Sequence, residues 1–326
     1  MNHDRIGALD RMPLPEAARL APPVDAGRLA AELAGVTGHR WRPQRIRTPG
    51  GGVGPATTVD WRVLPLHSLG GDPDRTDPGG PGPVDYAPTV WLARQPYLRE
   101  ILATIPAPLN AVRLMALGPG ASSHAHNDPK YALDRGFVRL HLPIVTHPNA
   151  ILVLDGVKHC WQPGEIWFGD FSREHQVRNA GPLTRVHAVI DALLTKGLAE
   201  WFPTYWQAAF AQGIALFNRC RPTTPHSPVA AARRTAALPH GFIEFDHDNS
   251  LDGPLCTVEI MTVDGGLALV TPERVLALVP VGPDEYRFTG WSEQRTIVLT
   301  DLGLLLRVRH GGALWELAVS AMPCAG

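Results

Sequence analysis

The chain has 326 residues, 44% of them hydrophobic and 19% charged, which are the proportions of an ordinary globular protein with one large domain or two modest ones. Its formal net charge of −1 excludes a strong field for nucleic acid or anionic membranes, so we expect neither as a partner. The four cysteines form no disulfide or zinc pattern, and no apolar run has the length of a signal-peptide core or membrane span, so we predict reduced thiols and a cytoplasmic protein.

The N-terminal part of the chain alternates short regular elements with loops. Residues 25–38 carry apolar side chains at helical spacing and end in Gly, which predicts an amphipathic helix. Residues 59–69 have the pattern of a strand, and residues 95–106 that of a second short helix. Between them, residues 70–88 are too rich in Gly and Pro for regular structure, and a loop this long is either disordered or a functional lid.

A run of short strands follows between residues 110 and 194. The segments AVRLMALG, FVRLHLPIVT, AILVLDG, EIWFGDF, HQVRNA and TRVHAVIDALL succeed one another at the intervals of an all-β sandwich or barrel. In FVRLHLPIVT the strand alternation places Arg139 and His141 on one face. Residues 192–220 have a helical pattern, which we expect to be broken near Pro203.

The C-terminal third of the chain is again strand-like. Residues 221–240 are polar and contain Pro, which predicts a linker. Residues 241–326 contain several apolar strands and no cluster of metal ligands. We therefore divide the chain into a domain of residues 1–220 whose core is residues 59–194, the linker, and a small β-rich domain of residues 241–326.

Potential metal ligands gather after the strand that ends near Gly118. His126 and Asp128 form an H-x-D pair, whose side chains project to the same side of an extended segment. His175, at the start of a later strand, would complete the two histidines and one carboxylate of a non-heme Fe(II) site with three open positions. His124 competes with His126 but has no carboxylate two residues on, and the bare pair also fits a solvated polar turn.

Two arginines interrupt otherwise apolar strands. Arg185 follows His175 by ten residues, and Arg139 lies in the strand FVRLHLPIVT. A guanidinium that points into a core needs an anionic partner, because an unpaired buried charge is very costly. A dicarboxylate co-substrate would provide that partner through a two-pronged contact.

Taken together, the motifs R-x-H-x-P-[IV], G-E-x-W, H-x-V-x-N and R-x-H-x-x-x-D resemble the aspartyl/asparaginyl β-hydroxylase family of Fe(II)- and 2-oxoglutarate-dependent oxygenases. The resemblance covers about residues 59–194 and is densest over residues 112–191. It implies a mainly β fold: a double-stranded β-helix core of the jelly-roll or cupin type with flanking helices, to which the C-terminal β-domain is added. It also implies Fe(II), 2-oxoglutarate and O2 as cofactors.

The resemblance assigns the iron ligands within that core. It implies that His126 and His175 bind iron, and the presence of Asp128 predicts a complete triad, although some members of the family bind iron through two histidines alone.

The resemblance also assigns the co-substrate contacts. Arg185 would hold the distal carboxylate of 2-oxoglutarate, and Arg139 and His141 would lie beside its metal-chelating end. Met115 stands where some members have a co-substrate serine, and Arg113 is a possible substitute for that contact. His187 shares a strand face with Arg185 and is either a core histidine or a support for the site.

The function that follows is hydroxylation of an amino acid residue. Our leading interpretation is the β-carbon of Asp or Asn in a peptide, as in the tailoring of a bacterial peptide natural product. The rival within the class is a hydroxylase of a free amino acid such as proline. Outside it stand a non-catalytic β-barrel binding protein, against which the intact set His126, Asp128, His175 and Arg185 argues, and a cupin-type isomerase, which would not need Arg185. We expect the C-terminal domain to serve substrate choice, or else to cover a sheet face or form a dimer interface.

Overall fold

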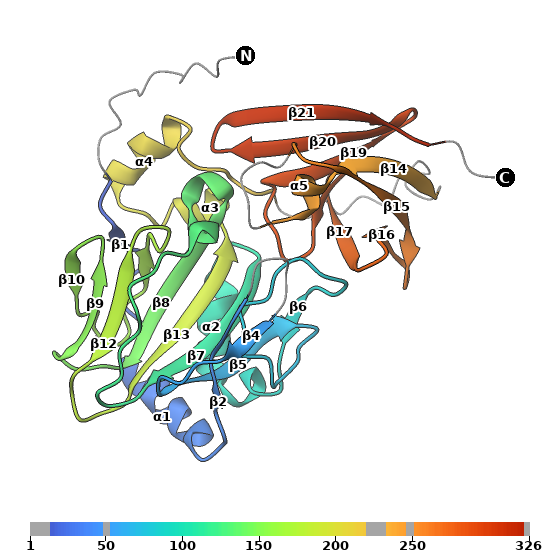
Figure 1. The fold of residues 1–326 in the computed structure, drawn as a ribbon. Coiled ribbons are helices and arrows are strands. Elements are labelled where there is room, and N and C mark those ends of the chain that lie inside the picture. The colour runs from blue at the N-terminus through green and yellow to red at the C-terminus, as the bar shows by residue number, and fades with distance from the viewer. Residues whose placement is uncertain (1–13, 48–52, 220–232, 246–250, 323–326) are drawn as a thin grey trace.

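The computed structural model describes residues 14–47, 53–219, 233–245 and 251–322 and has a mainly β fold, which confirms the predicted fold class. Two parts lie side by side: a β-sandwich with flanking helices, and a C-terminal sheet coloured orange to red (Figure 1). None of the described helices is both long enough and apolar enough to cross a membrane.

The larger sheet of the sandwich has eight strands in the order β1-β11-β8-β13-β7-β5-β2, with β6 added beside β5. All nine residues of its central strand β13 are buried, as expected of an almost continuous apolar run. The bounds of the strands are β1 Ala17–Arg19, β2 Arg42–Pro43, β5 Trp61–Leu69, β6 Tyr86–Pro88, β7 Leu109–Leu117, β8 Phe137–Val145, β11 Trp167–Gly169 and β13 Arg185–Leu193.

A smaller sheet forms the second layer of the sandwich. It has three strands in the order β10-β9-β12, with bounds β9 Ala150–Leu154, β10 Val157–His159 and β12 His175–Asn179. Leu152 and Leu154 of this sheet share a buried cluster with Leu117 and Phe137 of the larger one. A separate hairpin pairs β3 (Arg45–Arg47) with β4 (Val53–Ala56).

Helices α1 (Ala26–Thr37) and α2 (Pro96–Thr104) confirm the two predicted N-terminal helices. The Asp25 side chain caps α1 by accepting a hydrogen bond from the backbone N–H of Arg28. Leu29, Leu33 and Val36 form its buried stripe and pack in the same core cluster as the outer face of the larger sheet.

The helical prediction for residues 192–220 is correct only in part. The start of this segment is the end of β13. Of its residues up to 219, which the structure describes, only α3 (Lys196–Ala199) and α4 (Thr204–Ala211) are helical, with Pro203 between them as expected. Residues 192 and 193 belong to a strand and not to a helix because β13 is hydrogen-bonded on both sides, to β7 and to β8. Residues 221–232 of the predicted linker lie outside the described residues. The rest of it is regular: Arg234–Pro239 form β14 and His240–Ile243 form α5.

The C-terminal sheet is an antiparallel meander of eight strands, β14 to β21 in sequence order. A bridge between Thr235 and Met322 brings its first strand close to its last, so that the sheet nearly closes into a barrel. The remaining bounds are β15 Leu255–Val263, β16 Gly266–Val270, β17 Val275–Gly282, β18 Glu285–Phe288, β19 Arg295–Thr300, β20 Gly303–His310 and β21 Ala313–Ser320.

The loop of residues 70–88 joins the two parts. It is irregular as predicted, apart from β6 at its end. Its Gly82 carbonyl accepts a hydrogen bond from the backbone N–H of Ala277 in β17 (2.9 Å). Its Gly80 lies against Gly290, where an added Cβ would stand 2.3 Å from the Gly80 carbonyl oxygen. We call residues 77–82 the strap, because they run from the β-sandwich onto the C-terminal sheet.

Candidate active site

One face of the larger sheet carries most of the predicted site residues. Strand β13 lies between β8 and β7, and alternate residues of a strand point to the same side. Asp191 pairs in register with Arg139, while Val189 pairs with both His141 and Arg113. The face therefore brings together the charged and imidazole side chains of three strands: Arg113, Arg139, His141, Arg185, His187 and Asp191.

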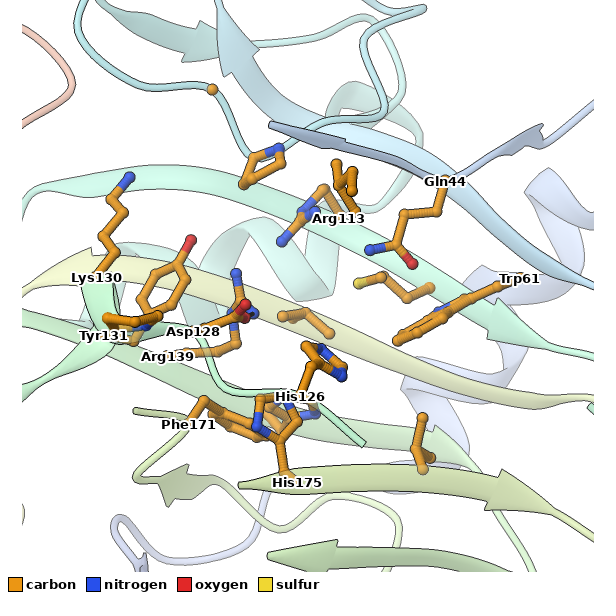
Figure 2. A pocket seen from close by; sticks show the side chains of 18 of the residues that line it. Gln44, Trp61, Arg113, His126, Asp128, Lys130, Tyr131, Arg139, Phe171 and His175 are labelled. Carbon is orange, nitrogen blue, oxygen red and sulfur yellow. Dashed lines mark hydrogen bonds and ion pairs between the residues drawn. The ribbon is translucent and has the colours of Figure 1, made fainter. Parts of the chain in front are cut away.

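The predicted iron ligands meet above this face, at the edge of the smaller sheet (Figure 2). His126 and His175 exchange backbone hydrogen bonds of 3.1 and 2.8 Å, which pin the segment after β7 to β12. The backbone N–H of Asp128 donates to the carbonyl of Phe171 (2.8 Å). One ligand atom from each of His126, Asp128 and His175 lies within 4.8 Å of the other two. The structure thus brings the three predicted ligands together.

The surroundings of the two imidazoles fit a metal. The Nδ1 atom of His126 lies 2.9 Å from the His124 carbonyl oxygen, and Nδ1 of His175 lies 3.0 Å from the Arg173 carbonyl oxygen. Both contacts leave Nε2 as the ligand atom, an arrangement usual for metal-binding histidines. Burial lowers the pKa of His175, which favours the neutral form that binds a metal. His124 itself contributes its backbone rather than its ring.

Arg185 is a buried cation without a carboxylate partner among the described residues. Its side chain is 4% exposed, and Nη2 lies 3.0 Å from Nδ1 of His187. Burial lowers the pKa of Arg185 to about 10. The pKa values of His141 and His187 are lowered well below their ordinary range, first by burial and then by Arg185, so both rings are neutral. Their buried Nε2 atoms make no hydrogen bond in the described structure. The part of the site around Arg185, His141 and His187 is therefore suited to bind an anion.

Arg139 and Arg113 are, by contrast, compensated within the protein. Arg139 donates from Nη1 to Asp128 (2.6 Å) and from Nε to Asp191 (2.7 Å). Arg113 donates to Asp191 (3.2 Å), as does the hydroxyl of Tyr131 (2.7 Å). The position of Asp191 was not predicted from the sequence; its signal was a carboxylate in an apolar strand, on the same face as Arg185.

A cavity of about 280 Å³ connects the ligand triad with Arg185. Phe245 and Trp291 of the C-terminal part also line it, with their ring centroids 5.0 Å apart. The Lys130 ammonium lies 5.5 Å from the centre of the Trp291 ring. Sequence reasoning missed Phe245 and Trp291, because no local pattern places a residue beyond position 240 beside the triad. It gave no role to Lys130, although that residue follows Asp128 by two positions. The strap contributes Pro78 and Gly79 to the same lining.

The family model described as aspartyl/asparaginyl β-hydroxylase matches residues 31–194, half of the chain. A search among curated proteins gave no match. Similar solved structures include an oxidoreductase of the 2OG-Fe(II) oxygenase family from Burkholderia pseudomallei (14% identity, TM-score 0.38), covering 55% of this chain and 85% of that one. A prolyl-4-hydroxylase from Pseudomonas putida (16% identity, TM-score 0.33) covers 55% of this chain and 91% of that one. Structural likeness at this level does not extend to substrate.

Proposed function

This chain belongs to the aspartyl/asparaginyl β-hydroxylase family, and from that premise we propose that it hydroxylates the β-carbon of an Asp or Asn residue in a peptide. It is a non-heme iron dioxygenase that uses Fe(II), 2-oxoglutarate and O2. When bound, the iron supplies the oxygen activation that converts 2-oxoglutarate to succinate and CO2 and hydroxylates a C–H bond.

The observation that carries the proposal is the uncompensated Arg185 beside the triad. The residues that would hold iron are His126, Asp128 and His175, which offer one face of ligands and leave the other positions open. Arg185 would hold the distal carboxylate of 2-oxoglutarate, an anion that none of the described residues supplies to it. His141 would face the metal-binding end of the co-substrate, and neutral His187 would orient the guanidinium of Arg185.

Arg139 and Arg113, which the resemblance placed at the co-substrate, are already paired with carboxylates of the protein. Arg139 would border the co-substrate while its charge is divided between Asp128 and Asp191. Arg113 is 2% exposed and ion-paired with Asp191, so its contact with 2-oxoglutarate would be secondary.

The size of the cavity supports insertion of a single residue. Its volume of about 280 Å³ is at the lower end for small-molecule sites and must also hold 2-oxoglutarate. The remaining space suits one amino acid side chain. Besides the arginines that pair with Asp191 or would face the co-substrate, its lining holds the cations Arg45, Lys130 and Arg135, and Asp128 is its one carboxylate among the described residues, which favours a substrate residue with a carboxylate or amide.

The same cavity leaves a second candidate, the hydroxylation of a free amino acid such as proline. Phe245 and Trp291 form an apolar wall that suits a pyrrolidine ring as well as the methylene of Asp. Because both residues come from the C-terminal part, we propose that residues 241–326 act in substrate choice, while residues 1–220 form the oxygenase domain.

The test is turnover with Fe(II), 2-oxoglutarate and O2 against peptides that each contain one Asp, Asn or Pro, and against the three free amino acids. We expect succinate formation coupled to the gain of one oxygen atom in an Asp or Asn peptide, detected by mass spectrometry. His126→Ala should abolish both products. Coupled oxidation of free proline alone would select the second candidate, and absence of succinate under all conditions would contradict the proposed activity.

A further inference from the structure

Asp191 is a fully buried carboxylate at the centre of the site, yet it touches neither the proposed ligand atoms nor Arg185. It is 1% exposed and lies on β13 opposite Arg139 of β8. Its Oδ1 accepts a hydrogen bond from Nε of Arg139 (2.7 Å). Its Oδ2 accepts from Nη2 of Arg139 (3.2 Å), from Arg113 (3.2 Å) and from Tyr131 (2.7 Å). The contacts that orient this carboxylate therefore come from two arginines of the sheet face and from Tyr131, in the turn that follows Asp128.

The charge on Asp191 is maintained by its neighbours. Burial alone would raise its pKa, but Arg139 and Arg113 outweigh burial and lower the pKa of Asp191 to about 2. The group is therefore ionised at neutral pH. Two buried guanidinium groups thus share one carboxylate, and the second carboxylate within reach of Arg139 is Asp128.

Arg139 is held in one orientation between the two carboxylates. Its Nη1 donates to Oδ2 of Asp128 (2.6 Å) while Nε and Nη2 face Asp191. The ring of Tyr131 lies against the guanidinium, 3.8 Å from its carbon to the ring centre. A planar group fixed in this way presents a single N–H to Asp128, and the other oxygen of Asp128 remains available.

We propose that Asp191 is a positioning residue for the metal: it takes most of the charge of Arg139, so that Arg139 orients one oxygen of Asp128 and leaves the other to the iron. Without the Asp191 charge, Arg113 would lose its carboxylate partner, and Arg139 would keep Asp128 as its one carboxylate partner among the described residues. Asp128 would then be drawn into a closer pair with Arg139 and would be withdrawn from the metal. This inference rests on the proposed iron site.

The test is the affinity of the purified protein for Mn(II), followed by the electron paramagnetic resonance signal of the free ion. Asp191→Asn keeps the shape of the side chain and removes its charge. We expect it to weaken Mn(II) binding by about 10- to 100-fold, the usual effect of losing a residue that supports a metal ligand. The double variant Asp191→Asn with Arg139→Gln also removes the cation that competes for Asp128, so its affinity should exceed that of Asp191→Asn; it should stay below that of the wild type, because the hydrogen bond that orients Asp128 is lost. A loss caused by general loosening of the core would not recover in this way.

Glu285→Gln is the matched control. Glu285 is also a buried carboxylate paired with arginines, Arg219, Arg307 and Arg309, but it lies in the C-terminal sheet and does not line the cavity. We expect this variant to lose stability and to keep its affinity for Mn(II).

The outcomes separate the inference from the proposed function. If the wild type binds Mn(II), His126→Ala does not, and Asp191→Asn binds as tightly as the wild type, the inference is overturned while the iron site stands. If His126→Ala binds like the wild type, the iron site itself is wrong. If Asp191→Asn does not fold, Arg139→Lys tests the same inference, because a lysine ammonium cannot contact both Asp128 and Asp191 as the guanidinium does. Weaker Mn(II) binding is then expected, and unchanged binding would overturn the inference.

Discussion

Among individual residues, the arginines of the cavity differ in how their charges are compensated. Arg113 and Arg139 are both paired with the buried carboxylate of Asp191, whereas Arg185 has only a neutral imidazole within hydrogen-bond distance in the described structure. Keeping a guanidinium charged in such a place is unfavourable, and burial lowers the pKa of Arg185 accordingly. An anionic ligand removes this penalty, which is the physical basis for assigning the co-substrate to Arg185.

Replacing Arg185 by Ala should raise the KM for 2-oxoglutarate. Loss of a charge-assisted contact in a desolvated pocket costs roughly 2 to 5 kcal/mol, provided that the ligand carboxylate finds no other partner. Steady-state succinate formation measures the change. Arg62→Ala, which removes an exposed arginine of β5, is the control and should have no effect. An unchanged KM for 2-oxoglutarate in Arg185→Ala would refute the assignment.

Stability toward acid should depend on Glu285. Its carboxylate is buried, but hydrogen bonds from Thr296, Arg309 and Arg219 lower its pKa from 4.5 to about 2. Because the folded pKa lies below the unfolded one, the contribution is fully present above pH 4.5 and disappears as the pH falls toward 2. A shift of this size corresponds to at most about 3 kcal/mol of unfolding free energy at neutral pH.

The measurement is chemical denaturation of the wild type and of Glu285→Gln at pH values from 7 down to 3. The variant should be less stable at pH 7, and the gap should narrow on acidification. A difference in unfolding free energy that stays constant with pH would mean that the charge of the Glu285 carboxylate does not contribute to stability.

At the level of elements, local patterns predicted the strands that alternate or are wholly apolar, and with them the side of β8 that carries Arg139 and His141. They failed where the pattern was ambiguous. β18 was missed because Glu285 and Arg287 are buried through ion pairs and backbone contacts rather than exposed in alternation. The triad and Arg185 could be found because each lies in a recognisable motif. Phe245 and Trp291 could not, because their place depends on how two sheets meet.

The contact between the strap and the C-terminal sheet depends on Gly290. Its φ is +73°, and an added Cβ would stand 2.3 Å from the Gly80 carbonyl oxygen. Gly290→Ala should therefore displace the strap, lower the Tm and expose Arg75 to trypsin. Gly265→Ala is the matched control, because φ is +79° there and no atom lies within 4 Å, so that only the backbone cost of about 1 to 2 kcal/mol remains. Equal losses of Tm in the two variants would show that the strap contact is unimportant.

For the molecule as a whole, the sandwich and the C-terminal sheet share a single buried cluster. Tyr131, Phe137 and Phe171 from the cavity side belong to the same cluster as Phe245 and Trp291. Hydrogen bonds add to this contact: the Asn218 side chain accepts from the backbone of Glu293, and the backbone N–H of Gly311 donates to the carbonyl of Asp134. Neither part can unfold without exposing apolar surface of the other.

We therefore expect one cooperative thermal transition for the full chain. Differential scanning calorimetry should give a van't Hoff enthalpy equal to the calorimetric one. Two resolved transitions, or a variant ending near residue 219 that keeps the Tm of the full chain, would show that the parts fold independently.

The isolated charge of Arg185 also has a consequence for the medium in which the protein is handled. A buried guanidinium that no carboxylate of the described residues neutralises will recruit small anions from solution, so chloride, sulfate or formate should each raise the melting temperature of protein prepared without 2-oxoglutarate. The same anions should act as competitive inhibitors with an order of potency set by size and shape, not by ionic strength. The measured affinity for 2-oxoglutarate will therefore depend on the buffer salt. It will be highest in salts whose anions bind Arg185 weakly.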